Sequence, residues 1–179
     1  MKYVALLRGI NVAGQKRVPM ADLKKVFEGL KFKNIETYIQ SGNVVFEYHE
    51  WKTGPMVMAI EKAIEKKFGF EVDVVVRTEK DWPKILKSNP YTAEAQKDPK
   101  FLHVFMLEGK PRDPKLDELA TYCQNGEKFT LRGSELYVYY GAGAGKSKLV
   151  LSVIEKKLGT SGTARNWLTM QTLAEMLEA

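Results

Sequence analysis

The sequence is poor in the residues from which small proteins build covalent or metal cross-links. Its 179 residues include one cysteine, Cys123, and two histidines, His49 and His103. A single cysteine cannot form an internal disulfide, and two histidines so far apart offer no metal-ligand spacing. We therefore expect no metal and no cofactor, and a protein that is held together by its hydrophobic core in a reducing compartment.

Long hydrophobic runs are also missing. The chain opens with an apolar run from Tyr3 to Leu7 that ends at Arg8, which is too short for the apolar region of a signal peptide or for a membrane span. The sequence therefore predicts a cytoplasmic protein with no membrane partner. A hydrophobic content of 44% and a charged content of 28% are those of an ordinary globular chain.

The excess of positive charge is modest and uneven. The net charge is +6, residues 1–90 carry 16 basic and 11 acidic side chains, and residues 91–179 carry 12 and 11. Many of the lysines fall on predicted helices, where a solvated face is the usual explanation. A basic first half nevertheless leaves nucleic acid, bound without sequence specificity, as one alternative partner.

The hydrophobic pattern of residues 1–78 predicts the order βαββαβ. A strand at 3–8 is apolar on both faces, a helix follows Pro19, a hairpin occupies 38–46, a second helix begins at Thr53 and ends at Gly69, and a strand covers 72–77. Gly42 supplies the positive φ that a tight hairpin turn requires. This order is that of a ferredoxin-like unit.

The same order recurs after residue 100. The pattern predicts a strand at 101–107, a short helix at 116–122, a hairpin at 128–140 that turns at Gly133, and a helix that ends at Gly159. The segment Ile-Glu-Lys-Lys-Phe-Gly at 64–69 matches Ile-Glu-Lys-Lys-Leu-Gly at 154–159, an offset of 90, and the hairpin glycines match at an offset of 91. Both matches indicate an internal repeat.

We therefore predict an α+β fold of two ferredoxin-like βαββαβ units in tandem with a C-terminal helix. Residues 1–78 form the first unit, residues 79–100 a short helix at 82–87 and a linker, and residues 101–179 the second unit plus the terminal helix, which Asn166 caps. Because both first strands are apolar on two faces, either the sheets cover one another or the chain forms a homo-oligomer.

Several stretches together resemble one bacterial family, called domain of unknown function 1697. They are Leu6–Asn11, Val18–Met20, Tyr38–Phe46, Gly145–Leu149 and Thr163–Trp167. The resemblance covers nearly the whole chain. It implies a cytoplasmic protein with paired ferredoxin-like units and no established activity, so it supports the fold and leaves the function open.

One polar cluster is expected where the first and second strands end. These strands run parallel in a βαββαβ unit, so the loop after the first and the turn after the second lie at the same end of the sheet. An arginine with amides and a hydroxyl suits the phosphate or carboxylate group of a small ligand. No carboxylate, cysteine or histidine is expected there, so no catalytic constellation is recognisable. The predicted ligand-binding residues are Arg8, Asn11, Gln40, Ser41, Gly42 and Asn43. These side chains could instead serve only to tie the loop to the hairpin.

A second anion-binding candidate lies in the other half. A glycine-rich loop at 141–147 precedes a helix and is expected near the end of the last strand. Its candidate residues are Gly145, Lys146, Ser147, Arg165 and Asn166. The alternative is a flexible connector in which Ser147 caps the helix.

Two familiar nucleotide-binding patterns are excluded by position. A phosphate-binding P-loop requires a glycine where this chain has Tyr140. An RNA-recognition domain requires stacking aromatics on the open sheet face, and Tyr3 alone fits that pattern, with Phe46 expected on the other face. The best hypothesis is therefore anion binding at the first cluster, with a nucleic-acid-associated or scaffold protein, or a structural homodimer, as alternatives.

Overall fold

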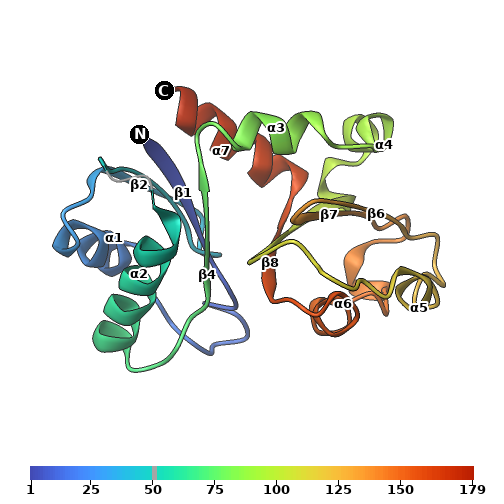
Figure 1. Cartoon of the computed structure of the whole chain (residues 1–179), viewed down its shortest axis with the longest axis horizontal. Helices are drawn as coiled ribbons and strands as arrows, with labels where there is room; N and C mark the ends of the chain where they lie inside the picture. Colours follow the sequence, from blue (N-terminus) through green and yellow to red (C-terminus); the bar gives the residue numbers. More distant parts are fainter. Residues whose placement is uncertain (50–51) are drawn as a thin grey trace. The chain divides into compact units, whose positions relative to one another are not determined.

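The computed structural model describes residues 1–49 and 52–179, and the chain divides into two compact units (Figure 1). The first unit comprises residues 1–84 and 173–179, and the second comprises residues 85–172. Each unit has one four-stranded antiparallel sheet and the ferredoxin-like order of elements. The predicted α+β fold with a C-terminal helix is confirmed. Within the described ranges, no helix combines the length and the apolar character that a membrane span requires.

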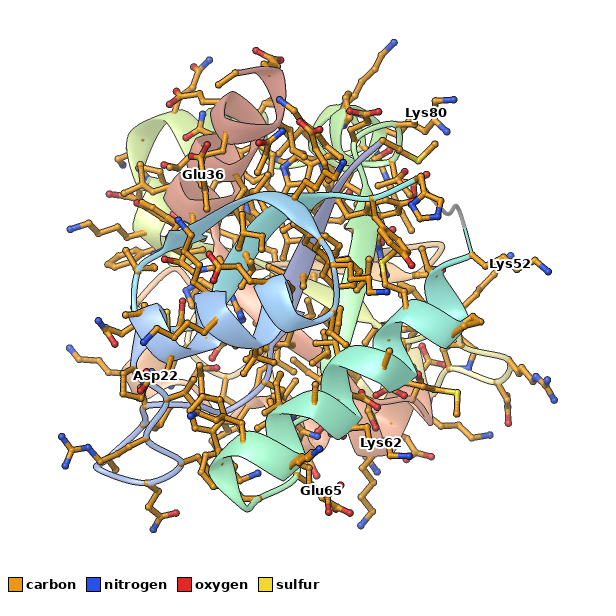
Figure 2. The ribbon with its side chains drawn as sticks, turned by 90° about the vertical axis from the view of Figure 1, so that its left-hand side faces the viewer. Asp22, Glu36, Lys52, Lys62, Glu65 and Lys80 are labelled. Carbon is orange, nitrogen blue, oxygen red and sulfur yellow. The ribbon has the colours of Figure 1, made fainter. Side chains whose placement is uncertain are left out.

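The first sheet has the strand order β2-β3-β1-β4, with β1 antiparallel to both of its neighbours. Helices α1 and α2 cover one of its faces, and they lie in front of the strands in Figure 2. The elements of this unit are β1 (Lys2–Leu7), α1 (Met20–Gly29), β2 (Lys33–Tyr38), β3 (Asn43–Glu47), α2 (Thr53–Phe68) and β4 (Val74–Thr78).

The central strand β1 is buried on both faces, as its sequence predicts. Tyr3, Ala5 and Leu7 pack in the core beneath the two helices. The alternating residues Val4 and Leu6 point to the opposite face and are also 0% exposed. The register pairs Tyr3 with Phe46, and their rings stack with centroids 5.6 Å apart. The expectation that Tyr3 and Phe46 lie on different faces is therefore wrong, and both rings belong to the helix-covered core.

The second sheet repeats the first in the order β6-β7-β5-β8, with β5 antiparallel to both of its neighbours. Helix α3 (Trp82–Lys87) is confirmed, and α7 (Trp167–Glu178) forms the C-terminal helix. The elements between them are α4 (Thr92–Lys97), the 3-10 turn η1 (Pro99–Phe101), β5 (Leu102–Leu107), α5 (Leu116–Ala120), β6 (Lys128–Arg132), β7 (Glu135–Tyr139), the 3-10 turn η2 (Ala144–Lys146), α6 (Leu151–Leu158) and β8 (Gly162–Asn166).

The sequence predicts the helix ends better than it predicts the connection between the units. Gly69 and Gly159 end α2 and α6 in the left-handed conformation, and each donates its N–H to a glutamate carbonyl at 2.8 Å. The Asn166 side chain accepts the Thr169 N–H at 3.0 Å and caps α7. Residues 89–99 are not a plain loop, because α4 forms there around the buried Ala95.

Candidate functional site

Two loops of the first unit meet at one end of its sheet. Strands β1 and β2 are both antiparallel to β3, so their C-terminal ends lie at the same edge. The Leu7 N–H donates to the Gly42 carbonyl at 2.9 Å, and the Asn11 side chain donates to the Gln40 carbonyl at 2.8 Å. The loop after β1 and the hairpin tip therefore meet, and we call residues 8–17 and 39–43 together the rim.

The amides of Asn11 and Asn43 hold the rim together. Besides its bond to residue 40, Asn11 donates to the Val18 carbonyl at 3.0 Å and accepts the Val18 N–H at 2.8 Å. Asn43 is 0% exposed, and its amide donates to the Tyr38 carbonyl at 2.9 Å and to the Ser41 hydroxyl at 3.0 Å. Two of the predicted ligand-binding side chains therefore shape the site from inside, whereas Gln40 is exposed at the surface.

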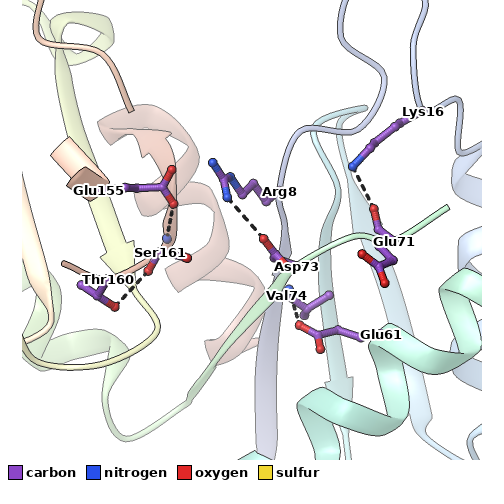
Figure 3. A network of polar contacts seen from close by, with 10 residues as sticks. Arg8, Lys16, Glu61, Glu71, Asp73, Val74, Glu155, Thr160 and Ser161 are labelled. Carbon is purple, nitrogen blue, oxygen red and sulfur yellow. Dashed lines mark hydrogen bonds and ion pairs between the residues drawn. The ribbon is translucent and has the colours of Figure 1, made fainter. Parts of the chain in front are cut away.

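Arg8 lies beside a carboxylate. Its backbone N–H donates to the Asp73 carbonyl at 3.0 Å, and its guanidinium Nη1 lies 3.3 Å from Asp73 Oδ2, with side-chain exposures of 32% and 52% (Figure 3). The expectation that this end of the sheet lacks a carboxylate is wrong. Because β4 is antiparallel to β1 and pairs Val74 with Leu7, the residue before β4 must reach the end of β1.

The segment that leads into β4 is fixed from two further directions. The Lys16 ammonium donates to the Glu71 carbonyl at 2.8 Å, and the Glu61 carboxylate of α2 accepts the Val74 N–H at 3.0 Å (Figure 3). The rim is therefore backed by a well-anchored segment. Its surface combines cationic side chains with neighbouring carboxylates.

The backbone of the rim is strained. Asn11, Ala13, Lys16 and Ile39 have φ values of 54°, 51°, 46° and 48°, a left-handed conformation that costs an L-residue about 1–2 kcal/mol. Ile39 is the most unusual of these, because it is β-branched and its side chain is 49% exposed. Strained residues of this kind concentrate at recognition sites, where the surrounding structure holds them in place.

In the second candidate cluster, the glycine-rich loop is fastened to the turn that precedes β6. The Ser147 hydroxyl donates to Glu127 at 2.6 Å and accepts the Leu149 N–H at 3.0 Å. Burial would raise the pKa of the Glu127 carboxyl, but hydrogen bonds from Ser147 and from the Asn125 backbone hold that pKa below its usual value. The alternative prediction that Ser147 caps the following helix is wrong, because α6 begins only at Leu151.

Arg165 lies within strand β8. It is 7% exposed, and its guanidinium donates to the Thr163 hydroxyl and to the Ala164 carbonyl, both at 2.8 Å. Burial lowers its pKa to about 10. Arg165 pairs with Val104 in the sheet, on the face opposite the neighbouring residue Phe105, whereas Leu149 after the loop packs with Phe105. The predicted members of this cluster therefore belong to different faces of the sheet.

Comparison with known proteins supports the fold and adds no activity. A family described as "Protein of unknown function (DUF1697)" matches residues 1–137. The solved structure of a conserved bacterial protein from Streptococcus pneumoniae is similar, with a TM-score of 0.71 and 23% sequence identity over 98% of each chain. No curated protein matches the chain.

Proposed function

We propose that this chain, which belongs to the family described as "Protein of unknown function (DUF1697)", binds a small ligand at its rim. The ligand would be held through a phosphate or carboxylate group. The observation that carries the proposal is the tie made by Asn11, whose side-chain amide donates to the Gln40 carbonyl at 2.8 Å and so holds the basic loop against the polar hairpin tip. This tie brings the predicted binding segments together.

The chemistry of the rim suits an oxyanion. Arg8 carries a planar guanidinium that can grip two oxygens in parallel, and Lys16 and Arg17 stand on the same exposed loop. The ion pair between Arg8 and Asp73 is partly exposed, at 32% and 52%, and pairs of this kind contribute about 0–1 kcal/mol. A bidentate phosphate can therefore compete with Asp73 for Arg8.

A small anion fits this surface better than a nucleic acid does. Glu71 and Asp73 flank the basic loop, and their carboxylates would repel the row of phosphates on a polynucleotide. Single-stranded DNA should consequently bind weakly, with an affinity that collapses as salt is added.

Thermal melts with inorganic phosphate test the proposal. Phosphate should raise the melting temperature of the native chain above that measured in chloride at equal ionic strength. A ligand at 100 times its Kd adds about 2.7 kcal/mol, which corresponds to roughly 5–11 °C for a chain of this size. Arg8→Ala should abolish the rise, and Arg8→Lys should reduce it because the planar fork is lost.

Arg112→Ala is the matched control, because Arg112 is an arginine that solvent can reach, as Arg8 is, but lies in the second unit. It should leave the phosphate response unchanged. An equal response in Arg8→Ala and in the native chain would refute the rim as the binding site. The absence of any response to phosphate, and to acetate as the carboxylate probe, would refute anion binding itself.

A further inference from the structure

A surface groove runs along the free edge of the first sheet, apart from the rim. Its main part has a volume of about 690 Å³, which is within the range of ligand sites, roughly 300–1,000 Å³. Its charged side chains come from β1, α1, β2 and β3: Lys2, Lys24, Glu28, Lys33, Glu36 and Glu47. A smaller hollow of about 220 Å³ shares Lys33 and Glu47 with it, so the two form one elongated groove, which we call the edge groove.

The edge groove has an apolar base. Phe32, Ile35 and Phe46 line it and are 7%, 6% and 0% exposed, and the rings of Phe32 and Phe46 stack at 4.4 Å. Such a base is rigid, because its side chains are packed in the core of the unit. A ligand placed on it would meet a fixed surface below and mobile charged side chains around it.

Strand β2 forms one wall and offers hydrogen bonds. It is the outer strand of its sheet and pairs with β3 alone, so the backbone groups on its other edge point away from the sheet. A register shift between Lys33 and Glu36 marks a bulge, and Asn34 within it has a φ of 49°. Bulges bend a strand and redirect side chains, and they are frequent beside binding sites.

The charges of the edge groove do not neutralise one another. Among residues 1–49 and 52–179, the ion pairs involve none of Lys24, Lys33, Glu28, Glu36 and Glu47. Ammonium and carboxylate groups therefore surround the same hollow without coming within 4.0 Å of each other. The groove can accept positive and negative groups of one ligand at the same time.

We infer that the edge groove binds an extended peptide segment of mixed charge, which adds to β2 as a further strand. Main-chain hydrogen bonds to the strand edge would supply affinity, and alternate side chains would supply specificity. Alternate residues of an extended chain point to the same side about 7 Å apart, so a Lys and a Glu two positions apart can meet opposite charges in the groove. The carboxylates of Glu28, Glu36 and Glu47 in the lining disfavour a polynucleotide.

The test is a titration of the full chain, labelled with ¹⁵N, with a capped peptide of sequence Lys-Thr-Glu-Thr-Lys-Thr-Glu. The amide signals of β2, from Asn34 to Tyr38, should shift in a saturable manner. The same peptide N-methylated at alternate residues keeps its charges but loses the backbone donors. It should fail to shift these signals.

Two neighbouring lysines of α1 provide matched variants. Lys24 lines the groove and Lys25 does not, although both are exposed on the same helix. Lys24→Glu should weaken binding of the peptide by about 2- to 10-fold, because an exposed ion pair becomes a like-charge contact. Lys25→Glu should leave binding unchanged, which separates the groove from a general effect of charge.

Four results would overturn the inference. They are the absence of shifts in β2, equal binding of the N-methylated peptide, equal effects of the two lysine variants, and binding of an octathymidine in place of the peptide. Light scattering at two concentrations adds a fifth. Concentration-dependent dimerisation that Glu36→Lys abolishes would assign the groove to a second copy of this chain.

Discussion

Replacing Gly42 with alanine should be among the most damaging single changes in the first unit. Gly42 has a φ of 84°, and a Cβ atom placed on it would lie 2.7 Å from Ile10 Cδ1 and 2.8 Å from Leu7 Cβ. The first contact can be relieved by rotation of a side chain. The second cannot, because Leu7 Cβ is attached directly to the backbone of the buried strand β1.

The cost has two parts that can be separated. The left-handed conformation costs a non-glycine residue about 1–2 kcal/mol, and overpacking a filled core adds about 1–3 kcal/mol. Gly42→Ala should therefore lose about 2–5 kcal/mol of unfolding free energy. Gly69 is the matched control, because its φ is 82° and no atom lies within 4 Å of its added Cβ. Gly69→Ala should lose only the first part.

Urea denaturation followed by circular dichroism measures both variants against the native chain. The excess cost of Gly42→Ala over Gly69→Ala reports the close approach of the hairpin tip to β1. In the Ile10→Val background the Cδ1 contact is gone, so Gly42→Ala should cost less there, and a double-mutant cycle gives the coupling. Equal costs for the two glycine variants, or zero coupling, would refute the packing described here.

Three further predictions concern the rim, a helix end and the second unit. Asn11→Ala should lose about 2–4 kcal/mol of unfolding free energy in urea denaturation, because three hydrogen bonds of 2.8–3.0 Å disappear. A loss below about 0.5 kcal/mol, the range of an ordinary surface substitution, would contradict the role of Asn11 in holding the rim together. Lys31→Gly should raise the unfolding free energy by up to about 1 kcal/mol, and the melting temperature with it, because Lys31 follows the C-cap of α1 at a φ of 64°. Burial holds the pKa of His103 below 6.5, so the unfolded chain binds the proton first and stability should fall as pH drops below about 6.5. His103→Gln should flatten that slope in melts across the same pH range, and an unchanged slope would refute it.

The sequence predicts those parts of the fold that depend on local periodicity and on glycine. Strand β1 is apolar at every position from Tyr3 to Leu7, so its burial on two faces follows directly. Gly69 and Gly159 mark helix ends because only glycine adopts the left-handed conformation without a steric cost. The meeting of the loop after β1 with the hairpin tip also follows, since it requires only the strand order of a βαββαβ unit.

The roles of the polar residues could not be predicted in the same way. A residue type says what a side chain can bond, but the direction in which it points depends on packing. Asn11 and Asn43 have the chemistry of ligand-binding residues, yet their amides satisfy backbone groups of the rim. Asp73 lies outside the predicted cluster for a different reason: it comes just before the fourth strand, and the pairing of that strand with β1 brings it to Arg8.

The repeat itself provides a control for what the fold requires. Both units have the same strand order, but within residues 85–172 only glycines have a positive φ. Among the described residues of the first unit, six others do, at the rim or beside the edge groove: Asn11, Ala13, Lys16, Lys31, Asn34 and Ile39. Because the second unit builds the same fold without this strain, the fold does not demand it. The strain in the first unit is therefore best explained by the shapes of its two surfaces, which supports the proposed binding sites there.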